Sequence, residues 1–201
     1  MSPPPQPDPI APETAAGATA LLIVDMISCW DFPDADKLLA GARRVAPVIA
    51  QLKARCKRAG VPAIYANDNR GRWRSDFPAL VGASLAGGGP AAAITGVVEP
   101  SREDYFVLKP SQSAFYGTPL ELLLRHLEVK RIVVTGVASD QCVLSTVLDA
   151  RMRSLAVVVP RDGVATQSTP RNRAVLRQLE EVHQVATTPS ARVRLAQRTT
   201  S

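Results

Sequence analysis

Short apolar runs alternate with longer amphipathic segments from about residue 19 onward. Runs rich in Val, Ile, Leu and Ala predict strands at 20–25, 62–67, 105–109, 131–136, 155–160 and near 183–187. Segments with apolar residues on one face predict helices at 35–59, 119–127, 141–153 and 171–181. Because the strands are apolar almost throughout, helices must cover both faces of a mostly parallel sheet. The pattern therefore predicts a three-layer α/β fold.

Two stretches depart from this alternation. Residues 68–104 are rich in Gly, Pro and Ala and only weakly periodic, which predicts a short helix at 76–82, a surface loop through 87–90 and a short strand or turn at 94–98. Residues 1–18 hold many of the prolines and predict an extended or disordered arm. We therefore expect one folded domain, at 19–198.

Composition narrows the class of protein. A chain of 201 residues with 46% hydrophobic and 21% charged residues suits one soluble domain. No apolar run approaches the roughly 20 residues that span a bilayer, and the N-terminus lacks the basic-then-apolar design of a secretory signal. Three cysteines without a CxxC pattern indicate free thiols in a reducing compartment. We expect a cytoplasmic protein with no membrane partner.

The net charge of +6 does not by itself identify a partner. The basic residues are scattered over several segments, and no nucleic-acid-binding motif accompanies them. A solvated basic surface is therefore favoured over nucleic-acid binding, and a preference for anionic small substrates stays open.

Three chemically capable side chains come at or just after the ends of predicted strands. Asp25 ends the run ALLIVD, Lys109 ends YFVLK, and Cys142 follows RIVVTG by six residues. Open parallel sheets bind ligands beyond the carboxyl ends of their strands, so we expect these three residues to meet at one edge.

Each of the three also has a structural interpretation. Asp25 could close the following loop, Lys109 could extend to solvent, and Cys142 could be a small core residue. Together they indicate nucleophilic catalysis, because a Cys in the first turn of a helix lies near the positive end of the helix dipole. That position and a nearby Lys predict a lowered thiol pKa, with Asp25 as the general base and then the general acid. Backbone N–H groups in the GVASDQC turn could bind an oxyanion.

Three segments carry a resemblance to a known family: LLIVDM with Asp25, VLKPSQSAFYGTPLELLL with Lys109, and VVTGVASDQCVLSTVLDA with Cys142. Together, over residues 19–190, they resemble the isochorismatase-like cysteine hydrolases, which include nicotinamidases, N-carbamoylsarcosine amidohydrolases and related ureide hydrolases. The resemblance implies a doubly wound, six-stranded, mostly parallel sheet and an Asp-Lys-Cys triad. Such a triad forms a thioester acyl-enzyme with a small-molecule substrate and releases an amine or ammonia.

The same resemblance implies further features. The peptide between Val137 and Ala138 would be cis, and the N–H groups of Ala138 and Cys142 would form the oxyanion hole. A homo-oligomer, dimer or tetramer, is expected on this ground alone. Nicotinamidases carry a metal site built from an Asp and two His after the second strand, but this chain has no His at 66–125. We therefore expect neither a metal nor another cofactor.

Substrate contacts are where the sequence departs from the family pattern. Members often have Gln and Phe two and five residues after the catalytic Asp, where this chain has Ile27 and Trp30. We expect Trp30, Asn67, Trp73 and Phe115 to contact the substrate. The alternatives are that Asn67 closes a turn, as Asx side chains readily do, and that the aromatic residues only pack.

Three hypotheses for function follow. The favoured one is a metal-independent cysteine hydrolase that cleaves a C–N bond of a small amide, ureide or carbamoyl compound. The second is hydrolysis of a vinyl ether, as in isochorismate, with Asp25 as the acid; the relatives compared for this reaction lack the Cys. The third is a non-catalytic binding domain on the same fold.

Overall fold

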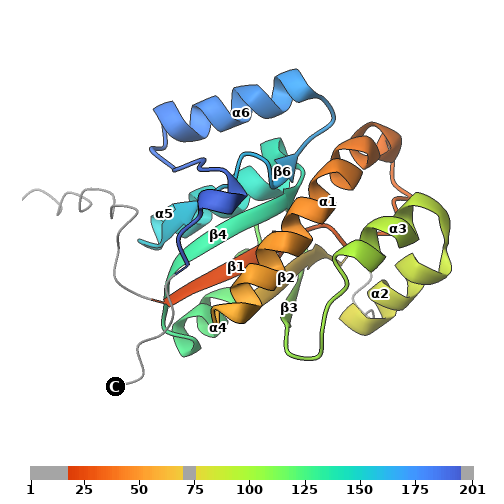
Figure 1. Ribbon diagram of the computed structural model, residues 1–201, viewed down its shortest axis with the longest axis horizontal. Coiled ribbons are helices and arrows are strands. Elements are labelled where there is room, and N and C mark those ends of the chain that lie inside the picture. The colour runs from red at the N-terminus through yellow and green to blue at the C-terminus, as the bar shows by residue number, and fades with distance from the viewer. Residues whose placement is uncertain (1–17, 70–75, 196–201) are drawn as a thin grey trace, which may run out of the picture.

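The computed structural model in Figure 1 describes residues 18–69 and 76–195 as a central sheet between two layers of helices. Six strands of the described chain form the sheet: β1 (Ala18–Val24), β2 (Ala63–Asp68), β3 (Tyr105–Lys109), β4 (Val129–Val137), β5 (Ala156–Val158) and β6 (Val164–Ala165). They run parallel in the order β3-β2-β1-β4-β5, and β6 also pairs with β4. The predicted three-layer α/β class is confirmed.

Each face of the sheet packs against its own set of helices. The helices are α1 (Ala35–Arg58), α2 (Phe77–Ala86), α3 (Gly89–Val97), α4 (Leu120–His126), α5 (Leu144–Met152) and α6 (Thr169–Glu181). Alternate residues of β1 separate the two cores: Leu21 and Ile23 pack with α1–α3, whereas Leu22 and Val24 pack with α4–α6. This alternation explains why the strands are apolar on both sides.

The strand order places one pair of strand ends in a special position. The chain crosses from β1 outward through β2 to β3, and then returns to add β4 on the other side of β1. The connections leaving β1 and β4 therefore diverge, which opens a crevice between the carboxyl ends of these strands. Asp25 follows β1 directly, and Cys142 follows β4 by a short turn.

Two predictions of secondary structure need correction, and a third falls almost wholly outside the described residues. Residues 94–98 were expected as a strand or turn, but they fall mainly in α3, because the Ala-rich segment after Pro90 continues as a helix. The segment 183–187 makes only an isolated bridge, Val158 to Ala186, and the sixth strand is instead the unpredicted β6. The expected N-terminal arm lies outside the described residues except Ala18, which already belongs to β1.

Candidate active site

The adjoining ends of β1 and β4 are closely packed. Val24 pairs with Gly136, whose φ is +111°, and a Cβ at this glycine would lie 2.0 Å from the carbonyl oxygen of Val24. Only glycine fits such an approach. The peptide that follows, between Val137 and Ala138, is cis.

A π-helical turn (Ser139–Val143) follows the cis peptide and leads into α5. The carbonyl of Ala138 closes this turn by accepting bonds from the N–H groups of Gln141 and Val143, at 3.1 and 3.2 Å. Cys142 is thereby held in the turn before α5 begins, beside the end of β1.

Asp25 is fixed through both its backbone and its side chain. Its backbone lies in the left-handed region, with φ of 51°, and its N–H donates to the carbonyl of Ala66 at 3.0 Å. One carboxylate oxygen accepts from the N–H of Asp68 at 2.8 Å, and the other is 2.8 Å from Nζ of Lys109. The carboxylate is therefore oriented between β2 and β3.

Lys109 is the last residue of β3, and its side chain is fully buried. Besides Asp25, its Nζ contacts Sγ of Cys142 at 3.4 Å, the carbonyl of Ser111 at 3.3 Å and the carboxylate of Asp68 at 4.0 Å. A buried ammonium with these neighbours is stabilised by charge and by hydrogen bonds. It joins Asp25 and Cys142, so the structure brings the three predicted residues together.

The protonation of this triad differs from the sequence-based prediction. Burial and the carboxylate of Asp25 raise the pKa of Cys142 to about 12, and these effects outweigh the opposing Lys109. The predicted lowering of the thiol pKa is therefore wrong, because the sulfur is desolvated beside a carboxylate. Burial also raises the pKa of Asp25 above 3.8, although Lys109 opposes this. For Lys109, burial lowers the pKa but Asp25 and Cys142 raise it, with a net increase.

These shifts define the resting state and the next proton transfer. At neutral pH the thiol keeps its proton, and the carboxyl group of Asp25, whose pKa burial raises, lies 2.8 Å from Nζ of Lys109. A carboxylate with a raised pKa is a stronger base than an ordinary one, so it is suited to take the thiol proton while the sulfur attacks.

A cavity of about 410 Å³ opens over Asp25 and Cys142. Its apolar wall comes from Ile27, Trp30, Phe32, Leu38 and Val137. Polar groups enter it at a few positions: Ser28, Asp68, Gln141 and the triad residues Asp25 and Cys142. A mainly apolar pocket with a few converging polar groups suits a small organic molecule. Ala138 also lines this cavity, so a substrate carbonyl above Cys142 would lie beside the predicted oxyanion-binding turn.

The predicted substrate contacts have different outcomes. Trp30 lines the cavity, 5.9 Å from Phe32 between ring centroids. Asn67 is 1% exposed and does not line it; its amide donates to the carbonyl of Ile27 at 2.7 Å, so it supports the wall. Trp73 lies outside the described residues.

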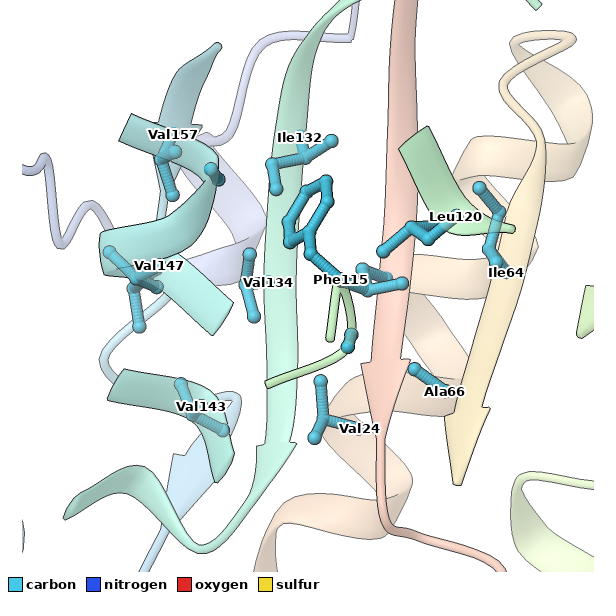
Figure 2. Packing of buried hydrophobic residues seen from close by; sticks show 14 of the residues in the cluster. Val24, Ile64, Ala66, Phe115, Leu120, Ile132, Val134, Val143, Val147 and Val157 are labelled. Atoms are coloured by element: carbon cyan, nitrogen blue, oxygen red, sulfur yellow. The ribbon is translucent and has the colours of Figure 1, made fainter. Parts of the chain in front are cut away.

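Phe115 was also expected to contact the substrate, and that prediction is wrong. Its side chain is buried in the core on the α4–α6 side. Figure 2 shows the ring among Ile132, Val134 and Leu120, packed against strands β1 and β4. The aromatic ring of the KPSQSAF segment therefore packs in the core on the α4–α6 side of the sheet and not in the cavity.

Sequence reasoning missed part of the cavity wall. Phe32, Leu38 and Gln141 line the cavity without having been singled out. Asp68 was not assigned to the site, although it follows the same strand-end rule as Lys109, with which it pairs in register. Its position as the last residue of β2 was the available signal.

The fold and the triad together define a class: an α/β protein with a cysteine, a carboxylate and a buried lysine at its topological switch point. Residues 19–190 match the Isochorismatase domain family, and the chain belongs to this family of hydrolases.

Three comparisons illustrate the relationship. The chain is 36% identical to the uncharacterized isochorismatase family protein YaaI of Bacillus subtilis, over 81% of this chain and 89% of that protein. It is 32% identical to streptothricin hydrolase of Streptomyces noursei, over 80% of this chain but only 60% of the relative. The crystal structure of N-carbamoylsarcosine amidase from Thermoplasma acidophilum superposes with a TM-score of 0.59 at 26% identity, covering 86% and 96% of the two chains.

None of the helices in the described part of the chain is both long and apolar enough to cross a bilayer. No group of three or more His, Cys, Asp or Glu side chains in residues 18–69 and 76–195 is arranged to hold a metal ion.

Proposed function

We propose that the protein hydrolyses a C–N bond in a small amide, ureide or carbamoyl compound through a thioester on Cys142. The observation that carries this proposal is the position of Nζ of Lys109, 2.8 Å from Asp25 and 3.4 Å from Cys142, two residues that line a cavity of about 410 Å³. The names of two relatives, N-carbamoylsarcosine amidase and streptothricin hydrolase, agree with this class of reaction.

The reaction begins when Asp25 takes the proton of the Cys142 thiol. The sulfur then bonds to the substrate carbonyl carbon, and the N–H groups of Ala138 and Cys142 stabilise the oxyanion. Asp25 returns the proton to the leaving nitrogen as the C–N bond breaks, which releases ammonia or an amine and leaves the thioester. Water, deprotonated by Asp25, attacks the thioester, and the sulfur leaves with the proton. Lys109 keeps its charge throughout and holds both partners.

The apolar wall favours a substrate with a small apolar or aromatic body beside its amide group. We also propose that the enzyme acts in the cytoplasm, because Cys29, Cys56 and Cys142 are all free thiols. A homo-oligomer stays a prediction of the family resemblance.

The test is a panel of small amides, ureides and carbamoyl compounds assayed for ammonia or amine release, with the Cys142→Ala variant in parallel. The rate of amide hydrolysis by Cys142→Ala should be at least about a thousandfold lower than that of the wild type. Isochorismate is the counter-substrate, because a vinyl ether cleaved by Asp25 needs no sulfur. Ether cleavage that survives Cys142→Ala, with no amide turned over, would contradict the proposal. A protein inactive on every compound would support the binding-domain alternative.

A further inference from the structure

Asp140 is a charged residue of the π-helical turn (Ser139–Val143), and its side chain does not line the cavity. It lies two residues before Cys142 in the π-helical turn, yet it does not line the cavity, whereas its neighbour Gln141 does. Its side chain is only 12% exposed. The reaction proposed above gives this carboxylate no role.

Both oxygens of Asp140 are engaged by residues further along the chain, Thr166 just after β6 and Arg171 in the first turn of α6. The hydroxyl of Thr166 donates to Oδ1, and the guanidinium of Arg171 donates to Oδ2 and forms an ion pair with it. Thr166 is 4% exposed. The carboxylate therefore joins the turn after β4 to a segment more than twenty residues further along the chain.

Arg171 is itself held in place at the start of α6. Its guanidinium also donates to Oε1 of Gln167 at 2.6 Å, and its N–H donates to the Ser168 cap at 3.4 Å. A cation in the first turn of a helix is unfavourable for the helix, because the N-terminus carries the positive end of the dipole. The carboxylate of Asp140 offsets this unfavourable positive charge. The Asp140–Arg171 ion pair therefore links the π-helical turn to α6.

The turn depends on support from outside itself. A π-helical turn is rare, and the carbonyl of Ala138 at its start accepts two N–H groups, those of Gln141 and Val143. The turn determines where Sγ of Cys142 lies relative to Lys109, at 3.4 Å. A small rotation of the turn would break this contact and move the N–H groups predicted to bind the oxyanion.

We propose that Asp140 is a positioning residue for the nucleophile, acting through Thr166 and Arg171 to hold the Ser139–Val143 turn against the cavity. The kinetic part of this inference depends on the proposed hydrolase function. The structural part, the environment of the Cys142 thiol, can be measured without a substrate.

The experiment measures the rate at which iodoacetamide alkylates Cys142 between pH 6 and 10, by mass spectrometry of the Cys142 peptide in the full chain. In the wild type, burial and Asp25 suppress the thiolate. In Asp140→Asn the turn should loosen, so alkylation at pH 8 should be at least about tenfold faster, with the pH midpoint moved toward that of an ordinary thiol near 8.5. With an amide substrate, kcat should fall about tenfold while KM changes less than threefold.

A matched control comes from the opposite end of the sheet. Asp104 is 10% exposed, pairs with Lys53 at 2.6 Å and accepts from the N–H of Ser101 at 2.6 Å, but it does not touch the turn. Asp104→Asn should lower the melting temperature without changing the Cys142 profile. Thr166→Val removes the hydroxyl donor at nearly constant shape and should shift the alkylation profile of Cys142 in the same direction as Asp140→Asn. Thr166→Ser keeps the hydroxyl, so its profile should match that of the wild type.

The outcomes separate the two proposals. An Asp140→Asn profile that superposes on the wild type, or an equal shift in Asp104→Asn, overturns the positioning role. A shifted profile in a protein whose wild type hydrolyses no amide overturns the hydrolase proposal and leaves the positioning inference standing.

Discussion

Asp25 and Cys142 of the triad (Asp25, Lys109 and Cys142) line the same cavity as the wall segment (residues 27–32), but the triad and the wall segment are held in different ways. The triad residues are fixed by strand ends and by charged groups 2.8 to 4.0 Å from Nζ of Lys109. The wall segment is a loop whose shape depends on side chains from other elements. Asn67 donates to the carbonyl of Ile27, and Ser84 donates to that of Ser28 at 2.7 Å. The sheet therefore positions the triad, whereas the side chains that anchor the loop position the cavity wall.

The largest effect should come from the backbone that supports the triad. Gly136→Ala places a Cβ 2.0 Å from the carbonyl oxygen of Val24, so β1 and β4 cannot pair at their ends. We expect little soluble folded protein and no activity, measured by expression yield and circular dichroism. Gly82→Ala is the control, because a Cβ there meets nothing within 4 Å and alanine favours the helix. Equal yields of the two variants would contradict the account of the strand ends.

The next effect concerns the charges of the triad. Asp25→Asn removes the proposed base and should lower kcat by about a thousandfold. Because the carboxylate raises the pKa of Cys142, its removal should lower that pKa, and the alkylation midpoint should move to lower pH. Lys109→Met should move it in the opposite direction, since the ammonium lowers the same pKa. Shifts with reversed signs would show that the three groups do not interact as described.

On the wall side, Asn67→Asp replaces the amide that donates to Ile27 with a carboxylate in a buried position. The lost bond and the buried charge should cost roughly 1 to 3 kcal/mol in the free energy of unfolding. KM should rise more than kcat falls, because the wall moves and the triad does not. Urea unfolding and steady-state kinetics measure both. An unchanged KM and an unchanged free energy of unfolding in Asn67→Asp would show that Asn67 does not support the cavity wall.

The smallest effect should come from Trp30 itself. Trp30→Leu removes an aromatic surface from the cavity and its contact with Phe32, without touching the triad. We expect KM to change several-fold, by an amount that differs between aromatic and aliphatic amides, with kcat within about threefold. Competition between two such amides measures this directly. A Trp30→Leu variant whose kcat falls equally on all substrates would show that Trp30 acts in the chemical step and not in substrate selection.

The contrast also explains what the sequence could predict. Asp25, Lys109 and Cys142 were predictable, because each follows an apolar strand and parallel strands align their carboxyl ends. Trp30 was predictable from the family resemblance, because members often have an aromatic residue five positions after the catalytic Asp. Phe115 and Asn67 were not, since a position near a catalytic residue does not say to which side of the sheet a side chain points.

The protonation state of the thiol lay beyond the sequence for a similar reason. The sequence indicates a helix start and a lysine, both of which lower a thiol pKa. It does not indicate that the sulfur is desolvated next to Asp25, and these two effects prevail. Likewise, β6 has only two residues, too few for a hydrophobic pattern, and it forms because Gly136 and Val137 offer it a partner.

Formation of the Cys142 thioester is tested by intact-mass spectrometry of the enzyme, quenched in acid within milliseconds of mixing with an amide that it hydrolyses. We expect a transient mass increase equal to the acyl group, which peptide mapping locates on Cys142, which is absent from Cys142→Ala and which rises in step with amine release. An enzyme that releases the amine at full rate while its mass stays unchanged and Cys142 remains unmodified at every time point would contradict the account.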